Sequence, residues 1–249
     1  MLVGEGGDEL GGYPIYKKLS AINRIFKILP DFLLKFLSNF STKLAKEIDI
    51  YVESKDYSIR RFVFGFSESE KKDMWKFKIP KTNSYQILKN LSDEITIKSK
   101  DKFYRKILNI EYKLRLSELI LPRIDYPTMA ASIEARAPFM DHQLIEYTSG
   151  LDFSLKMKKE TKTLIRGIAR SKLPNYILEQ PKVGFGQLLR PFFFDVLPVW
   201  YKREILDIKA PIKKYIAEDY LHKLYIEKDY SYRMWLIYSL NRWLLLNDV

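Results

Sequence analysis

Apolar side chains recur at helical spacing over most of the chain, and this periodicity constrains the fold more than any other feature. Between Asp101 and Leu121 the residues on one such face are Phe103, Ile107, Ile110, Leu114 and Leu121. A last helix is predicted through YRMWLIYSLNRWLLL, which is apolar on most sides and is therefore expected to be buried. Further helices are expected at 15–28, 31–47, 56–64, 140–149, 160–172 and 213–226. The sequence predicts a mainly α-helical single domain over residues 1–249, without internal repeats.

The best strand candidate is the short segment MLV, which directly precedes Gly4. A strand that leads into a glycine-rich turn and then a helix is how an α/β sheet presents a ligand site at its carboxyl edge. A single strand leaves its own backbone groups unpaired. The remainder of such a sheet is therefore expected elsewhere or is missing.

The segment GEGGDELGG that follows combines Gly4, Gly6 and Gly7 with the acidic residues Glu5 and Asp8. Glycines permit positive φ and close approach of a ligand to the backbone, whose N–H groups can hold phosphate. Carboxylates beside them can hold Mg²⁺ that bridges phosphate oxygens. An ordinary turn with an acid near a helix N-terminus explains the same residues equally well, so this segment alone leaves both interpretations open.

The composition excludes several kinds of site. The chain has no Cys and only two His, which excludes disulfides, thiolate zinc sites and centres with several histidines. Any metal is expected to have oxygen ligands, which suits Mg²⁺. No apolar run is long enough to span a bilayer and no secretory leader is visible, so we expect a soluble cytoplasmic protein without a membrane partner.

The formal net charge of +12 permits nucleic-acid binding, for which the best surface would carry Lys98, Lys100, Lys102, Arg105 and Lys106. Lysine is abundant along the whole chain, however, which favours a general compositional bias. We rank a nucleic-acid partner last.

Three further segments change the interpretation of the glycine-acid loop. They are LPRIDYPTMAASIEARAPFMDHQLIEY at 121–147, TKTLIRGIARSKLP at 161–174 and ILEQPKVGFGQLLRP at 177–191. With GEGGDELGGYPIY and the tryptophan-rich last helix, they resemble the synthetase domain of the glutamine-hydrolysing asparagine synthetases, in the same order. That family shows GEGxDELFGGYxxY, DRMSMAxSxEARxPFLDH, KxLLRxA and LPxxIxxRxKxGFGxP.

The resemblance implies a fold and a reaction. The fold would be the C-terminal helical part of an α/β adenine-nucleotide hydrolase-like (PP-loop) synthetase domain, with only a remnant of the parallel sheet. In the family, ATP activates the side-chain carboxylate of aspartate as an acyl-adenylate and releases pyrophosphate. Ammonia, derived from glutamine, then attacks the acyl carbon and AMP leaves. ATP and Mg²⁺ are the implied cofactors, and aspartate and glutamine or ammonia the implied small-molecule substrates.

The resemblance also assigns residues. Asp8 matches the Mg²⁺-binding aspartate, and Glu5 matches the glutamate that manages the proton during ammonia attack. Lys182 matches the lysine that neutralises charge on the phosphates and the developing oxyanion. The backbone of Gly4, Gly6 and Gly7, together with Lys182, would contact the nucleotide.

Other motif residues have structural alternatives. Glu134, Arg136 and Asp141 would shape the site, or Glu134 and Arg136 form a structural ion pair. For Lys162 and Arg166, at i,i+4 on one helical face, a solvated basic face is favoured over anion binding. Asp125 is predicted to cap a short helix.

The chain also departs from the family pattern. The bulky residue before the paired glycines is absent, because Leu10 is followed directly by Gly11, and Tyr126 and Gln180 stand where arginine is usual. No SGGxDS pyrophosphate loop and no glutaminase Cys are present. We therefore expect a fragment with little activity alone, to which a second chain could supply the missing half. Two alternatives stay open: a relative that amidates another carboxylate or a sugar, and a non-catalytic binding module.

Overall fold

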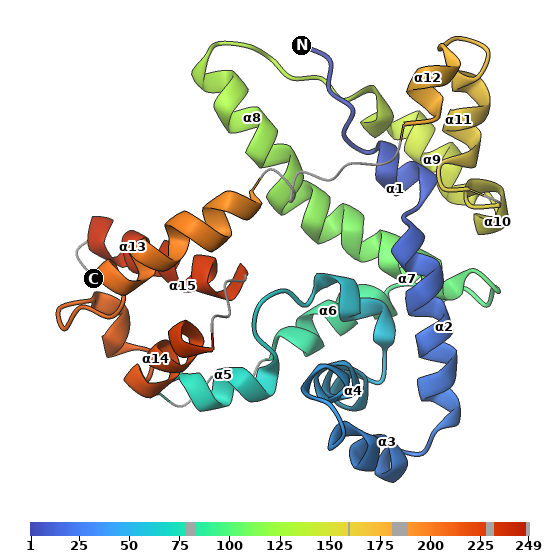
Figure 1. Ribbon diagram of the computed structural model, residues 1–249. Coiled ribbons are helices and arrows are strands. Elements are labelled where there is room, and N and C mark those ends of the chain that lie inside the picture. The colour runs from blue at the N-terminus through green and yellow to red at the C-terminus, as the bar shows by residue number, and fades with distance from the viewer. Residues whose placement is uncertain (78–82, 159, 181–188, 228–231, 248–249) are drawn as a thin grey trace. The chain divides into compact units, whose positions relative to one another are not determined.

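The structure is a computed structural model that describes residues 1–77, 83–158, 160–180, 189–227 and 232–247. The helical elements in these ranges confirm the prediction of a mainly α-helical chain (Figure 1). They are, in order, α1 Gly7–Gly11, α2 Pro14–Ile28, α3 Asp31–Ser38, α4 Thr42–Ser54, η1 Tyr57–Phe62, α5 Glu68–Met74, α6 Ser84–Asp93, α7 Lys102–Ile110, η2 Glu111–Ile120, α8 Leu121–Ala130, η3 Pro138–Met140, α9 His142–Gly150, α10 Phe153–Lys156, α11 Thr163–Ala169, α12 Asn175–Leu178, η5 Phe192–Val196, α13 Leu197–Glu204, η6 Pro211–Lys214, α14 Glu218–Ile226 and α15 Tyr232–Leu246.

The chain divides into two compact units. The first comprises Met1–Phe62 and Tyr85–Gln180, and the second comprises Val63–Ser84 and Pro181–Val249. β-Structure within the described ranges is limited to two isolated bridges, a parallel one between Leu2 and Arg136 and an antiparallel one between Trp75 and Ile216. None of the described helices combines the length and the apolar character needed to cross a membrane.

A long helical rod, made of α7, η2 and α8 in sequence, runs through the first unit (Figure 1). Its middle section η2 is a π-helix, and Leu121 N donates to Leu116 O across this wider turn. Pro122 follows at the start of α8, where its missing N–H leaves one backbone hydrogen bond of the rod unmade. Asp125 lies inside α8, so its prediction as a helix cap is wrong.

The apolar face predicted on this rod is confirmed in part, because Ile107 and Ile110 are fully buried in the first unit's core. Leu114 and Leu121 are half-buried, and the buried residues in this part of the rod are Leu116 and Ile120, which were not on the predicted face. From α2, Tyr16, Leu19 and Phe26 are buried as well. Removing this much apolar surface from water is the main stabilising contribution to such a fold.

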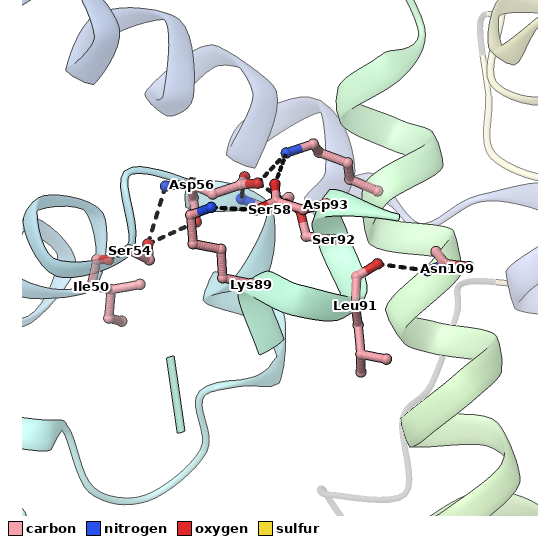
Figure 2. Close-up of polar contacts among 10 residues, drawn as sticks. Ile50, Ser54, Asp56, Ser58, Lys89, Leu91, Ser92, Asp93 and Asn109 are labelled. Atoms are coloured by element: carbon pink, nitrogen blue, oxygen red, sulfur yellow. Dashed lines mark hydrogen bonds and ion pairs between the residues drawn. The ribbon is translucent and has the colours of Figure 1, made fainter. Parts of the chain in front are cut away.

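A buried polar network joins the end of α4 to α6 and α7 in the same unit. Asp56 accepts hydrogen bonds from Ser58 N at 3.0 Å and Ser92 Oγ at 2.5 Å, as Figure 2 shows. Lys106 forms an ion pair with the same carboxylate. Although burial acts in the opposite direction, the hydrogen bonds from Lys106, Ser92 and Ser58 lower the pKa of Asp56. The carboxylate therefore stays ionised and links three helices.

The second unit has its own core, built from α13, α14 and α15. Leu197, Tyr201, Leu221 and Met234 are fully buried there. Asn241 is also fully buried, and its side-chain oxygen accepts a hydrogen bond from Ile212 N at 3.1 Å. The prediction of a last helix is confirmed. One side of α15 is exposed, however, at Trp243, Leu245 and Leu246.

Several predicted helix boundaries change. The helix expected at 31–47 is two helices, α3 and α4, because residues 39–41 leave the helical path between them. The segment expected at 56–64 is the 3-10 helix η1. The helix expected at 140–149 begins at His142, because Asp141 caps it, and the one expected at 213–226 begins at Glu218.

Candidate functional site

The first residues of the chain pair with the segment that carries Glu134 and Arg136. Val3 N donates to Arg136 O at 2.9 Å and Arg136 N donates to Met1 O at 2.8 Å, which makes a short parallel bridge. The Met1 ammonium donates to Glu134 O at 2.6 Å. The structure thus brings together two motifs that are far apart in the sequence, and it supplies the backbone partners that a lone MLV strand lacks.

The glycine-acid loop that follows is closely packed against η3. Gly6 has φ +87°, a conformation that favours glycine. A Cβ at Gly6 would lie 2.5 Å from Met140 Sδ, and one at Gly7 would lie 3.3 Å from the Phe139 ring. Gly7 N donates to Gly4 O at 3.4 Å, so the Gly7 N–H is used within the turn. These contacts exclude a loosely held turn here.

Helix α1 places Asp8 against Lys162. Lys162 N donates to Gly11 O at 3.0 Å, and Lys162 Nζ lies 2.6 Å from Asp8 Oδ1. A Cβ at Gly11 would lie 2.6 Å from Lys162 Cγ, so glycine is needed for this approach. Since its ammonium is paired, the prediction that Lys162 belongs to a solvated basic face is wrong. The structure instead places an ammonium on the carboxylate predicted to bind Mg²⁺.

Glu9, the neighbour of Asp8, belongs to a buried network with η2. Arg115 connects two carboxylates, donating to Glu9 Oε1 at 3.3 Å and to Glu111 Oε2 at 3.0 Å. Glu111 is fully buried and also pairs with Arg61. Tyr16 OH donates to Glu111 Oε1 at 3.1 Å. This network ties the glycine-acid loop to the helical rod.

Burial shapes the electrostatics of this network. It raises the pKa of Glu9, and the Glu111 and Asp8 carboxylates add to the effect, while the backbone N–H of Glu9 and the charge of Arg115 oppose it. Burial and the charges of Glu9 and Asp8 also raise the pKa of Tyr13. Two arginines balance two buried carboxylates, which is what makes their burial tolerable.

The other predicted site residues lie nearer the surface. Glu134 and Arg136 form a two-point ion pair, with both contacts at 3.1 Å and side chains 66% and 72% exposed. Asp141 accepts hydrogen bonds from Gln143 N and Leu144 N at the start of α9. Glu5 is half-buried, and Gly4 is exposed with open space around it. Lys182 lies outside the described residues.

The Mg²⁺ predicted for this loop needs several oxygen ligands. Asp8 supplies one carboxylate, and Lys162 already neutralises it. The described part of the chain contains no group of three acidic or histidine side chains that could hold a metal ion. These residues therefore do not make a complete Mg²⁺ site.

Sequence reasoning missed Glu9, Arg115 and Glu111 as a unit. One signal was present, because Glu111 lies four residues after Ile107 and next to Ile110, on the predicted apolar face of the helix. A charged residue at such a position needs a buried partner, and Arg115 stands one helical turn further on.

Comparison with known proteins gives consistent similarities. The family model described as asparagine synthase matches residues 1–245. "Asparagine synthetase [glutamine-hydrolyzing] 1" of Bacillus subtilis (strain 168) is 27% identical over 259 aligned residues, which cover 99% of this chain and 40% of that protein. A "Putative asparagine synthetase [glutamine-hydrolyzing]" of Mycobacterium bovis is 28% identical over 201 aligned residues, which cover 76% of this chain and 30% of that protein.

The chain spans two-fifths or less of the length of these relatives. No solved structure gives a significant match.

Proposed function

Because the chain belongs to the asparagine synthase family, we propose that it forms the C-terminal part of an ATP-dependent synthetase that converts the side-chain carboxylate of aspartate into an amide. One observation carries this proposal. Met1 and Val3, which directly precede the motif GEGGDE, are hydrogen-bonded to Arg136 of the motif IEARAPFM, and Met140 of the second motif packs against Gly6 of the first.

The proposed reaction has two steps. An oxygen of the aspartate side chain attacks the α-phosphorus of ATP, which gives the acyl-adenylate and pyrophosphate. The lone pair of ammonia, released from glutamine, then attacks the acyl carbon, the bond to the AMP oxygen breaks, and asparagine, AMP and a proton result. This reaction stays a proposal for the whole protein, which is longer in the relatives.

Each predicted site residue has a proposed task. Glu5 forms no hydrogen bond or ion pair with the other described residues, so its carboxylate is available to take the proton from the attacking ammonia. Asp8, held by Lys162, faces the same loop and is one proposed Mg²⁺ ligand. The remaining ligands would come from outside the described residues. Lys182 is proposed to neutralise negative charge on the phosphates and the acyl oxygen.

The buried network has a supporting task. Arg115 donates hydrogen bonds both to Glu9 of α1 and to Glu111 of η2, and so connects the two helices. We expect these residues to hold the direction of α1, and with it the position of Asp8, without contacting the substrate. The PP-loop fold of the complete domain is part of this proposal.

The experiment separates the two steps. The protein, expressed from its full gene, is incubated with Mg·ATP, aspartate and either glutamine or ammonium, and pyrophosphate and asparagine are measured separately. We expect Glu5→Gln to keep aspartate-dependent pyrophosphate release while losing asparagine formation by more than about tenfold. Glu118→Gln, an exposed acid on η2, is the matched control and should be normal in both.

Three outcomes would overturn parts of the proposal. If Glu5→Gln forms asparagine normally, Glu5 does not manage the proton. If pyrophosphate is released with another carboxylate or a sugar but not with aspartate, the protein is an amidating relative with a different acceptor. That alternative is suggested by Tyr126, which stands 72% exposed where the family usually has arginine. Absence of Mg·ATP binding would favour a non-catalytic module.

A further inference from the structure

A cavity of about 400 Å³ lies in the first unit, between the segment 94–101, the rod and helix α10. Its size is in the range of cavities that bind small molecules. Its apolar lining comes from Ile95, Ile97, Leu108, Leu151 and Phe153. Phe153 is held in place by stacking on Tyr104, with ring centres 4.0 Å apart and planes 4° from parallel.

Lys156 is a buried cation in the lining of this cavity. Lys156 as a whole is 2% exposed, and it forms no hydrogen bond or ion pair with the other described residues. Burial, and the positive charge of Arg105, lower the pKa of Lys156 to about 8, against the opposing effect of Asp101. The charge of Lys156 therefore lies in the lining of an open cavity without a hydrogen-bond or ion-pair partner among the described residues.

Two polar groups of the lining are buried and lack a hydrogen-bond partner. Arg105 donates from one terminal nitrogen to Ser149 O, while its buried Nε has no hydrogen-bond acceptor. The buried hydroxyl of Tyr112 has no partner either. Each of these groups is a hydrogen-bond donor, so the cavity combines three donors that lack an acceptor with an apolar lining.

The two acidic side chains of the lining, Asp101 and Glu94, already have hydrogen-bond or ion-pair partners. Asp101 Oδ2 accepts a hydrogen bond from Phe153 N at 2.8 Å. Glu94 pairs with Lys113 at 2.6 Å and accepts from Asn109 at 2.9 Å. Asn109 is fixed in turn by Leu91 O, as Figure 2 shows. With Glu94 balanced by Lys113, the cavity carries Arg105 and Lys156 against Asp101, which leaves one positive charge for a ligand to neutralise.

We propose that this cavity is a binding site for a small organic monocarboxylate with an apolar body, whose carboxylate meets Lys156 and Arg105. The apolar body would lie against Leu108 and Phe153. A monoanion matches the single excess charge, and the apolar part of the lining suits an organic body, which a free inorganic anion lacks. The site is separate from the glycine-acid loop and does not depend on the proposed synthetase reaction.

The test uses 4-fluorobenzoate as the probe and the neutral 4-fluorobenzamide as its isosteric comparison. Binding to the full-length protein at pH 7 is followed by ¹⁹F NMR titration. We expect saturable binding of the benzoate and at least about tenfold weaker binding of the benzamide, because a charge-assisted hydrogen bond is lost.

Three variants test whether 4-fluorobenzoate binds in this cavity. Lys156→Met should weaken benzoate binding at least about tenfold, while Lys158→Met, two residues away and exposed, should leave it unchanged. Thr96→Trp adds bulk at an exposed position of the lining and should block binding without affecting the thermal midpoint. It therefore tests the site even if Lys156→Met proves unstable.

The proposal is overturned by any of three results. Equal binding of the two probes would mean an apolar cavity without carboxylate recognition. Unchanged benzoate binding in both Lys156→Met and Thr96→Trp would place the probe elsewhere. No saturable binding of the benzoate would exclude a site for small monocarboxylates.

Discussion

The ammonium of Lys162 lies 2.6 Å from the carboxylate of Asp8, and the backbone N–H of the same lysine donates to Gly11. Lys162 therefore contacts α1 near both of its ends, at Asp8 and at Gly11, although it lies far from α1 in the sequence. Its backbone is in the left-handed region at φ +58°, directly before α11. This lysine joins two of the motifs that mark the family.

Removing the charge of Lys162 tests its role in positioning Asp8. Both side chains are about one-third exposed or less, so we expect Lys162→Met to change the free energy of unfolding by less than about 1 kcal/mol. Asparagine formation should fall more than about tenfold, because Asp8 loses a partner that orients it. Urea unfolding and the two-product assay measure these effects. Lys172→Met, an exposed lysine just after α11, is the control. Normal asparagine formation in Lys162→Met would contradict this role.

Glu111 is expected to be essential for the stability of the first unit. In Glu111→Gln the guanidinium groups of Arg61 and Arg115 lose a buried carboxylate, and we expect a loss of about 3 kcal/mol in the free energy of unfolding. Glu118→Gln removes an exposed carboxylate from the same helix and should stay within about 0.5 kcal/mol. Chemical unfolding followed by circular dichroism measures both. A Glu111→Gln variant as stable as the control would show that the network contributes little.

Gly6 and Gly4 form a matched pair for the loop conformation. Gly6→Ala places a Cβ at φ +87° and 2.5 Å from Met140 Sδ, so we expect a loss of about 1–3 kcal/mol in stability. Nothing lies within 4 Å of a Cβ at Gly4, and Gly4→Ala should change stability by less than about 0.5 kcal/mol. Thermal unfolding distinguishes them. Equal midpoints for the two variants would mean that the loop adapts freely.

Lys156 gives the stability of the protein a specific pH dependence. Its pKa is lowered from 10.5 to about 8 by burial and by Arg105, so between these values the unfolded chain binds more protons than the folded one. The contribution of Lys156 to stability therefore rises with pH from about 8 to about 10.5, and the cost of its buried charge is fully present below pH 8.

The variant Lys156→Met isolates this effect. It should be more stable than the natural protein at pH 7 by about 1–3 kcal/mol, and the difference should shrink as the pH approaches 10.5. Urea unfolding at a series of pH values measures it. A constant difference across this range would show that Lys156 titrates normally in the folded protein.

The sequence predicted helices well where an apolar face was long and uninterrupted. The helix expected at 15–28 agrees with α2, and the last helix agrees with α15. The break at residues 39–41 was missed, because Leu and Phe continue the apolar pattern up to it and no Gly or Pro marks the turn. The widened turn of η2 was also missed, since periodicity does not separate a π-helix from an α-helix.

The sequence identified residues of the candidate site but not most of the contacts between them. Glu134 and Arg136 form the ion pair that their spacing suggested as one of two possibilities. The partners of Asp8 and Glu9 were not predictable, since Lys162 and Arg115 lie in segments far from them in the sequence and many other lysines and arginines were equally plausible partners.

The sequence by itself determined that the chain is mainly helical and belongs to the asparagine synthase family, because periodicity and motif order are properties of the residue string. Only the tertiary structure decided that Met1 and Val3 pair with Arg136, that Lys162 neutralises Asp8, and that Lys156 is buried beside a cavity. The physical reason is that the energies of close packing and charge pairing depend on distances between segments, and those distances exist only after the chain has folded.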